Sequence, residues 1–285
     1  MRERISIVIP VHDEEAGLAR VLPELRKRFP DDEIIVVDDA STDGTPGVAA
    51  AAGARLVRHP YCMGNGAAIK SGARAASGKV IVFMDGDGQH EPADVERVCA
   101  ELKDGYAMVV GARTPGTHAS PFRLAANRVY NVLASWITGR RIEDLTSGLR
   151  AADAEKFREF LHLLPNGFSY PTTITMAFLR SGYPVRYVPI EAAARLGRSH
   201  VRPLRDGIRF LLIIFRIGTL YSPLKIFFPM SALLFLLGIA NYSYTYITQG
   251  RFTNMSALLL LASLFVFLIG LVSEQITALM FQRER

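Results

Sequence analysis

The chain has 285 residues, of which 49% are hydrophobic and 21% charged, and its formal net charge is +6. This apolar content excludes a disordered chain, and the length allows one domain with an appendage or two small domains. The two cysteines, Cys62 and Cys99, are too few for a disulfide scaffold and match no metal-site spacing. We expect no targeting segment, because Met1–Arg4 leads directly into the short apolar run Ile5–Pro10.

Strands and helices are predicted to alternate through the first part of the chain. Short runs rich in β-branched residues predict strands at Ile5–Pro10, Glu33–Asp38, Ala54–Arg58, Val80–Met84 and Ala107–Gly111. The stretches between them have helical patterns at Glu14–Arg28, Thr45–Ala52, Gly66–Ala76 and Pro92–Asp104. Such alternation is typical of right-handed crossovers, so we predict an α/β, Rossmann-like domain with a mostly parallel sheet.

Polar residues follow three of these strands at the point where each strand ends: His12-Asp13-Glu14, Asp38-Asp39-Ala40-Ser41 and Asp85-Gly86-Asp87-Gly88-Gln89. Ligands of parallel sheets bind at the carboxyl ends of the strands, so these clusters indicate a binding site. Neither familiar phosphate loop is present. The glycines of Gly64-Asn65-Gly66 lack the third glycine of a dinucleotide fingerprint, and no Walker A sequence occurs.

Asp85 and Asp87 flank Gly86 directly after a predicted buried strand. Aspartates two residues apart in a tight turn can place carboxylates on a hard cation, and Gly86 lets the backbone come close. Gln89 offers a further oxygen. We therefore predict that Mg²⁺ or Mn²⁺ is bound by Asp85, Asp87 and Gln89, with water and substrate phosphates as its other ligands. The alternative is a solvated Asp-Gly turn.

Basic residues are concentrated before the most apolar part of the chain. The segment Arg195–Lys225 has seven lysines and arginines against one acid, so it carries the whole formal net charge. Arg202, Arg205, Arg209 and Arg216 fall on one face of a helix, which predicts an amphipathic helix in the membrane interface whose arginines bind lipid phosphates. Nucleic acid is the usual alternative for a basic stripe, but the adjoining apolar segments favour lipid, and no nucleic-acid partner is expected.

Two segments without charged residues follow, Ile226–Gly250 and Phe252–Ser273. Each exceeds the roughly 20 helical residues that cross a hydrocarbon core, so we predict a transmembrane hairpin with helices at about 226–248 and 255–279. A buried core helix is the alternative, but two such runs in succession disfavour it. Basic residues flank both outer ends, which indicates a multi-pass protein of the cytoplasmic membrane with its catalytic domain in the cytoplasm.

The domain organisation expected from these observations has three parts. Residues 1–200 form the sheet domain, residues 201–225 form the basic juxtamembrane segment, and residues 226–281 form the hairpin.

The polar clusters belong to longer motifs, Ile9–Glu15, Val36–Thr45 and Val82–Pro92. With these motifs in this order, the chain resembles the family 2 glycosyltransferases with the GT-A fold. It is most similar to dolichyl-phosphate mannose synthase and its bacterial polyprenyl-phosphate relatives. Asp144–Arg150 resembles the acceptor-side loop of that family, and Arg195–His200 resembles its basic motif ahead of the membrane. The resemblance covers nearly the whole chain, hairpin included.

The resemblance implies roles for the matching residues. The nucleoside of a nucleotide-sugar is expected to contact Pro10, His12, Glu14, Val37 and Asp39, with Asp39 accepting hydrogen bonds from the base. The rest of the donor is expected to contact Asp85, Gly86, Asp87, Arg113, Arg195, Arg198 and Ser199. The expected catalytic residues are Asp87, Arg113 and Asp144, with Asp144 either a general base or a positioning residue.

Two positions depart from the family pattern. His12 stands where the family often has tyrosine, so stacking on the base is expected to differ. His200 stands where the family usually has lysine, so the charge there would depend on pH.

The reaction implied by the resemblance is transfer of one sugar, with inversion, from a UDP- or GDP-linked donor to an undecaprenyl or dolichyl phosphate. A phosphate monoester has a second pKa of about 6 and is largely dianionic at neutral pH, so this acceptor needs no strong base. Two alternatives remain open: a processive polysaccharide synthase on the same fold, and a catalytically silent nucleotide-sugar-binding scaffold in the membrane. Self-association into a homo-oligomer is a further expectation.

Overall fold

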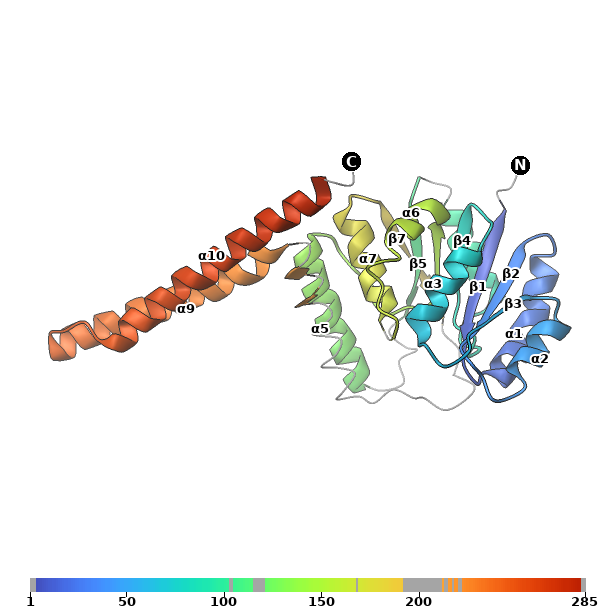
Figure 1. Cartoon of the computed structure of the whole chain (residues 1–285), viewed down its shortest axis with the longest axis horizontal. Coiled ribbons are helices and arrows are strands. Elements are labelled where there is room, and N and C mark those ends of the chain that lie inside the picture. The colour runs from blue at the N-terminus through green and yellow to red at the C-terminus, as the bar shows by residue number, and fades with distance from the viewer. Residues whose placement is uncertain are drawn as a thin grey trace. The chain divides into compact units, whose positions relative to one another are not determined.

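The computed structural model describes residues 4–102, 105–114, 121–167, 169–191 and 222–282, and positions 212, 215, 216, 218 and 219. These residues belong to two compact units. One unit is built on a β-sheet, and the other contains two long C-terminal helices with the last turn of helix α5 (Pro121–Thr138). The secondary structure of both units is drawn in Figure 1.

A seven-stranded sheet forms the centre of the first unit, in the order β3-β2-β1-β4-β6-β5-β7. Its strands are β1 (Ile5–Val11), β2 (Glu33–Asp38), β3 (Arg55–Arg58), β4 (Val80–Phe83), β5 (Met108–Arg113), β6 (Arg150–Asp153) and β7 (Val185–Ile190). Neighbouring strands are parallel except at β6, which is antiparallel to both β4 and β5. The predicted α/β class with a mostly parallel sheet is therefore confirmed.

The reversal of β6 matters for the site. Its first residue, Arg150, pairs with Phe83 at the end of β4. The loop that precedes β6 consequently lies at the same edge of the sheet as the carboxyl ends of β4 and β5, where ligands of parallel sheets bind.

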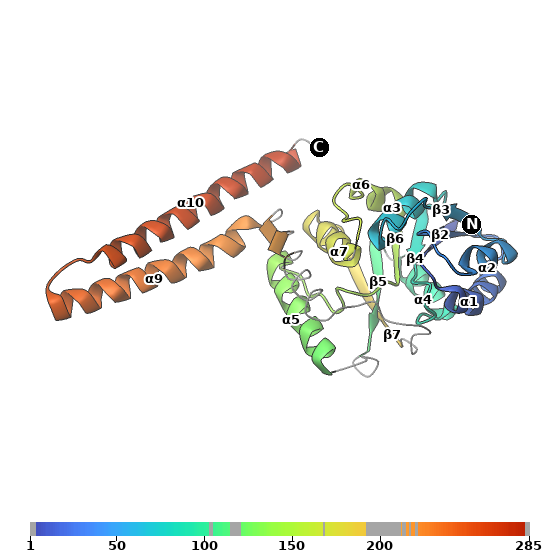
Figure 2. The ribbon, with the colours of Figure 1, turned by 60° about the horizontal axis from the view of Figure 1, so that its bottom comes forward.

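Helices cover both faces of the sheet (Figure 2). One face carries α1 (Glu15–Arg28), α2 (Thr45–Ala51) and α4 (Pro92–Leu102), and the other carries α3 (Asn65–Ala75), α6 (Ala154–Glu159) and α7 (Tyr170–Arg180). Because side chains alternate along a strand, Ile7 and Ile9 of β1 pack in one core with Leu22 of α1, whereas Val8 faces Gly72 of α3. The two apolar cores fix the sheet between its helical layers.

The strands and helices predicted up to the fifth strand are present, with bounds that differ by at most two residues. The fifth strand extends to Arg113 rather than ending at Gly111, which places the Arg113 side chain at the carboxyl edge. The elements from α5 to β7 have no counterpart among the predicted ones.

Two long apolar helices form the hairpin of the second unit: α9 (Pro223–Gln249) and α10 (Asn254–Gln282). They run side by side in opposite directions, and the Ser231 hydroxyl donates to the Ser263 carbonyl at 3.0 Å. Both are long and apolar enough to cross a membrane, and only 17% of the apolar stretch of each is buried. Such low burial is unlike that of a soluble core helix, so the predicted two-helix hairpin is confirmed.

Polar contacts hold the open end of the hairpin. The Glu274 carboxylate accepts the Leu224 N–H at 3.3 Å, which satisfies an otherwise unpaired donor at the start of α9. The Lys225 ammonium donates to the carbonyl of Ile137 at 2.9 Å, at the end of α5. A cation at a helix C-terminus is favourable, and this contact ties the last turn of α5 to the first turn of α9 within the second unit.

Of the predicted amphipathic helix, Arg202, Arg205 and Arg209 lie outside the described residues, whereas Arg216 is described and helical. The predicted domain boundary at residue 200 also lies outside the described residues. Both stay predictions, as does the boundary at residue 225.

Candidate functional site

The loops after β1 and β2 are joined by hydrogen bonds at the carboxyl edge of the sheet. His12 Nδ1 lies 2.8 Å from the Asp39 carbonyl oxygen, and the Asp13 N–H donates to the Ser41 hydroxyl at 3.0 Å. Because a carbonyl only accepts, His12 Nδ1 donates the proton in this bond. Asp13 and Ala40 both have positive φ, at 53° and 62°. Backbone strain of this kind is concentrated at functional sites.

The Asp39 carboxylate is almost fully buried and accepts hydrogen bonds from within the protein. Oδ1 lies 2.7 Å from His59 Nδ1 and 2.8 Å from the Met63 amide nitrogen, and Oδ2 lies 2.7 Å from the Gly64 amide nitrogen. The Cys62 thiol also donates to Oδ2, at 3.3 Å. Burial disfavours the charged form, but the bonds from His59, Met63 and Gly64 outweigh it and hold the pKa of Asp39 below its ordinary value.

The turn of Asp85, Gly86 and Asp87 follows β4 and is held against α1 and β1. A Cβ at Gly86 would lie 2.4 Å from Val11 Cγ1, and a Cβ at Gly17 of α1 would lie 2.3 Å from the Gly86 carbonyl oxygen. Glycine at both positions lets helix and strand close on the turn. The Asp87 carboxylate is 7% exposed and accepts the Gln89 N–H at 3.1 Å.

The Asp85 carboxylate lies over Gly148 in the loop before β6. A Cβ built on Gly148 would be only 1.9 Å from Asp85 Oδ2, so the missing side chain makes room for the carboxylate. The Tyr170 hydroxyl of α7 donates to the Gly148 carbonyl at 3.3 Å and so helps to hold the loop in place. The predicted metal-binding turn and the predicted acceptor-side loop therefore meet at this glycine.

Arg113 and Asp144 form a bidentate ion pair. Arg113 Nε donates to Asp144 Oδ2 at 2.8 Å, and Nη2 donates to Oδ1 at 3.0 Å. Asn131 of α5 clamps the chain on both sides of Asp144, because its Nδ2 donates to the Glu143 carbonyl and its Oδ1 accepts the Leu145 N–H. Arg113 Nη1 has no hydrogen-bond partner among the described residues. A guanidinium N–H group is a suitable donor for a phosphate oxygen.

The protonation state of Asp144 follows from this pairing. Burial disfavours its charge, but the hydrogen bonds and charge of Arg113 outweigh burial and lower the pKa of Asp144 below its ordinary value. A carboxylate with both oxygens on one guanidinium is a weak proton acceptor. The geometry supports a positioning role for Asp144 more than a general-base role.

The remaining predicted donor residues lie in several places. Pro10 and Val37 are paired in the register of β1 and β2, and both residues are buried within the sheet domain. Glu14 precedes α1, and its N–H donates to the Thr45 hydroxyl at 3.1 Å. Arg195, Arg198 and Ser199, with His200, lie outside the described residues.

Three further residues of the site have no predicted role. Arg150 is completely buried and donates to the carbonyls of Ser147 and Pro171. His59 links Asp39 to Ser71, and His90 places Nε2 3.9 Å from Asp85 Oδ2. Burial lowers the pKa of His90, so its ring is neutral at neutral pH. His90 and Arg150 lie within the motifs Val82–Pro92 and Asp144–Arg150 and could have been suspected from those positions, whereas His59 gives no local signal.

The donor set around Asp85 and Asp87 fits a cation that the protein binds through few ligands. Among the described residues, no group of three or more histidines, cysteines, aspartates and glutamates could hold a metal. Two carboxylates in a tight turn, with Gly148 leaving space at Asp85, suit Mg²⁺ or Mn²⁺, which commonly takes its other ligands from water and phosphates.

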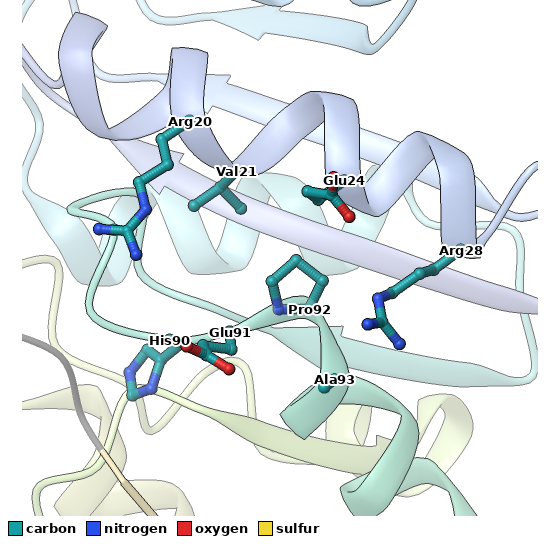
Figure 3. Close-up of a pocket in the computed structure, with 9 residues that line it drawn as sticks. Arg20, Val21, Glu24, Arg28, His90, Glu91, Pro92 and Ala93 are labelled. Carbon is teal, nitrogen blue, oxygen red and sulfur yellow. The ribbon is translucent and has the colours of Figure 1, made fainter.

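A separate cavity of about 210 Å³ lies between α1 and the turn that leads into α4. Figure 3 shows Arg20, Glu24 and Arg28 projecting from α1 toward the segment that contains His90 and Glu91. Its charges are mixed in sign, and neither Asp39, Asp85 nor Asp87 lines it. The candidate site is therefore assigned to the strand ends and not to this cavity.

Comparison with known proteins agrees with this geometry. Residues 6–159, more than half of the chain, match the model of "Glycosyl transferase family 2". The chain belongs to this family. It is thus a family 2 glycosyltransferase, which confirms the predicted family and enzyme class. Residues 222–279 match the model of the "GtrB C-terminal hairpin", in agreement with the two apolar helices.

Curated relatives of this family 2 glycosyltransferase cover most of its length. Glycosyltransferase AglJ of Haloferax volcanii is 29% identical over 233 residues, which are 79% of this chain and 75% of that protein. Dolichyl-phosphate hexose transferase of the same organism is 28% identical over 71% of this chain and 89% of its own. Undecaprenyl-phosphate 4-deoxy-4-formamido-L-arabinose transferase of Photorhabdus laumondii is 30% identical over 159 residues, which are 52% of this chain and 49% of that protein.

Solved structures of similar fold include glucosyl-3-phosphoglycerate synthase from Mycobacterium tuberculosis. One structure of that enzyme contains UDP, and another contains Mn²⁺, UDP-glucose and glycerol 3-phosphate. Each is 25% identical to this chain, with a TM-score of 0.61 over 76% of this chain and 80% of the other.

Proposed function

We propose that this family 2 glycosyltransferase moves one sugar, with inversion, from a nucleotide-sugar to a polyprenyl phosphate at the cytoplasmic face of a membrane. The observation that carries the proposal is the meeting of the Asp85–Asp87 turn with the loop before β6 at Gly148. A donor diphosphate at the turn and an acceptor at the loop would then be neighbours. The chain also carries two helices of membrane-spanning length.

The donor half of the proposal rests on the strand ends. The loops after β1 and β2 supply His12 and Asp39, and the turn after β4 supplies Asp85 and Asp87, so a nucleotide can extend along this edge from base to diphosphate. The similar synthase binds UDP and UDP-glucose in its own structures, which supports a nucleotide-sugar here.

Asp85 and Asp87 would hold Mg²⁺ or Mn²⁺ together with the donor diphosphate. When bound, such an ion supplies positive charge that stabilises the leaving diphosphate. The Gln89 N–H holds Asp87 in place through a hydrogen bond. The missing side chain at Gly148 leaves room for the Asp85 carboxylate. The Mn²⁺ in a structure of the similar synthase supports a divalent ion at this turn.

The acceptor half rests on Arg113 and Asp144. Asp144 orients the guanidinium of Arg113 through two hydrogen bonds and leaves Nη1 for a phosphate oxygen. A phosphate monoester with a second pKa of about 6 is already a nucleophile at neutral pH. Asp144 can therefore serve by positioning alone, with no proton to remove from the acceptor.

A polyprenyl phosphate stays in the bilayer, so its enzyme must meet it at the headgroup level. The hairpin would anchor the chain there, with the open end that carries Lys225 and Glu274 toward the cytoplasm. Two relatives are named as transferases that act on dolichyl and undecaprenyl phosphates, which supports this class of acceptor.

The proposal is tested by incubating the purified full chain with a UDP-hexose, Mn²⁺ and undecaprenyl phosphate. We expect nucleoside diphosphate release that requires the lipid, and a product with one hexose on the phosphate by mass spectrometry. Polymer formation would instead identify a processive synthase. Donor binding without lipid-dependent release, across a panel of UDP- and GDP-sugars, would identify a silent scaffold.

A further inference from the structure

The hydrogen bonds at Asp39 leave no acceptor position unused. An ionised carboxylate has about four lone-pair sites, and Asp39 accepts two donors on each oxygen. Its lowered pKa keeps it an acceptor only, so a base can bind it only through an N–H that replaces one of the present donors. One of these four donors must therefore leave Asp39 when a base binds.

Three of the four donors are held by the fold. His59 is buried, with its Nε2 2.9 Å from the Ser71 hydroxyl, which fixes the ring between two partners. The Met63 and Gly64 donors are backbone amides in the turn before α3. Gly64 has a φ of 99°, and a Cβ there would lie 2.7 Å from the Asn166 carbonyl oxygen, so this turn has little room to move.

The fourth donor, the Cys62 thiol, differs in each respect. An S–H group is a weak donor, its 3.3 Å contact is the longest of the four, and Cys62 is exposed. Burial and the contact with Asp39 raise the pKa of this thiol, so it stays protonated and donating at neutral pH. Replacing this bond with a stronger N–H bond would leave no buried donor without a hydrogen-bond partner.

Resting on the donor role proposed above, we infer that a nucleobase displaces the Cys62 thiol from Asp39 Oδ2, so that Asp39 selects uracil over guanine. Uracil presents one ring N–H, at N3, and needs one acceptor. Guanine presents two adjacent donors, N1–H and the N2 amino group, and would need a second acceptor position that His59, Met63 and Gly64 keep filled. Its second donor would then find no free acceptor position on Asp39.

The first test is calorimetric titration of the full chain in detergent with UDP and with GDP, both with Mn²⁺. We expect UDP to bind about tenfold more tightly than GDP or better. GDP binding as tight as UDP binding would overturn the inference while leaving the proposed transferase function intact. Failure of both nucleotides to bind would contradict the donor site itself, and the inference with it.

Two variants at position 62 test the exchange. Cys62→Ala removes the competing thiol and should tighten UDP binding by about threefold, with GDP still weak. Cys62→Ser restores a hydroxyl donor and should return the UDP affinity toward the wild-type value. A tenfold loss of UDP affinity in Cys62→Ala would show that the thiol supports the site rather than yielding to the base.

The alkylation rate of Cys62 should depend on UDP only if the base displaces the thiol, and not if Cys62 has a purely structural role. Saturating UDP should slow the reaction of Cys62 with iodoacetamide, because the displaced thiol would lie against the base. Cys99 of α4, which is partly buried, serves as the internal reference in the same chain. Equal rates at Cys62 with and without bound UDP would overturn the inference.

Discussion

Gly148→Ala is expected to reduce sugar transfer by about 100-fold or more while the protein stays folded. The added Cβ would lie 1.9 Å from Asp85 Oδ2 and 2.4 Å from Asp85 Cγ, and no real structure tolerates such contacts. Asp85 is 37% exposed, so its carboxylate can swing toward solvent at small cost to stability. The proposed metal site would then lose one of its two carboxylates. Initial rates of lipid-linked sugar formation measure the effect, and thermal unfolding checks the fold.

Gly47→Ala is the matched control for Gly148→Ala. Gly47 lies in α2, a Cβ there meets nothing within 4 Å, and its φ is not in the left-handed region. This change should leave the rate unchanged and stabilise the fold by about 0.5–1 kcal/mol. Wild-type activity in a folded Gly148→Ala protein would show that Asp85 need not keep its present place for catalysis.

Asp144→Asn and Arg113→Lys are each expected to reduce turnover by about 100-fold, and the double variant by no more than either one. Both single changes break the same bidentate pair, and the acceptor-side cation is then no longer aimed. Asp144 is 5% exposed, so Asp144→Asn should also cost about 2 kcal/mol of unfolding free energy or more. A double-mutant cycle of turnover numbers measures the coupling.

The same cycle separates positioning from proton transfer. If Asp144 removed a proton from the acceptor independently of Arg113, the two losses would multiply in the double variant. Near-normal turnover in Asp144→Asn would exclude an essential base and would also contradict the positioning role derived from the ion pair. Its position in the acceptor-side loop would then need another explanation.

The first part of the fold could be predicted because its strands have strong local signals. Runs such as Ile5–Pro10 and Glu33–Asp38 are apolar, β-branched and bounded by turn residues. Strand β6 gave no such signal, because Arg150–Asp153 contains no β-branched residue and begins with an arginine that is completely buried. Its antiparallel direction depends on pairing with β4 and β5, which lie far away in the sequence.

The sequence suggested candidate site residues but not the contacts between them. Asp85 and Asp87 adjoin a predicted strand, and their motif made them candidates. The pairing of Arg113 with Asp144 spans 31 positions and depends on the reversal of β6, which the sequence pattern did not indicate. The full hydrogen-bonding shell of Asp39 was missed because His59 and the Cys62–Gly64 turn, 20 or more positions away, reach it only in the folded chain.

Binding of Mn²⁺ to the full chain, followed by electron paramagnetic resonance with and without UDP, tests the central claim most directly. That claim is that Asp85 and Asp87 hold a divalent ion together with the donor diphosphate at the edge where the loop before β6 arrives. The account predicts that UDP tightens Mn²⁺ binding in the wild-type protein and that Asp85→Asn and Asp87→Asn each abolish this gain. UDP-dependent Mn²⁺ binding that is unchanged in both variants would contradict it.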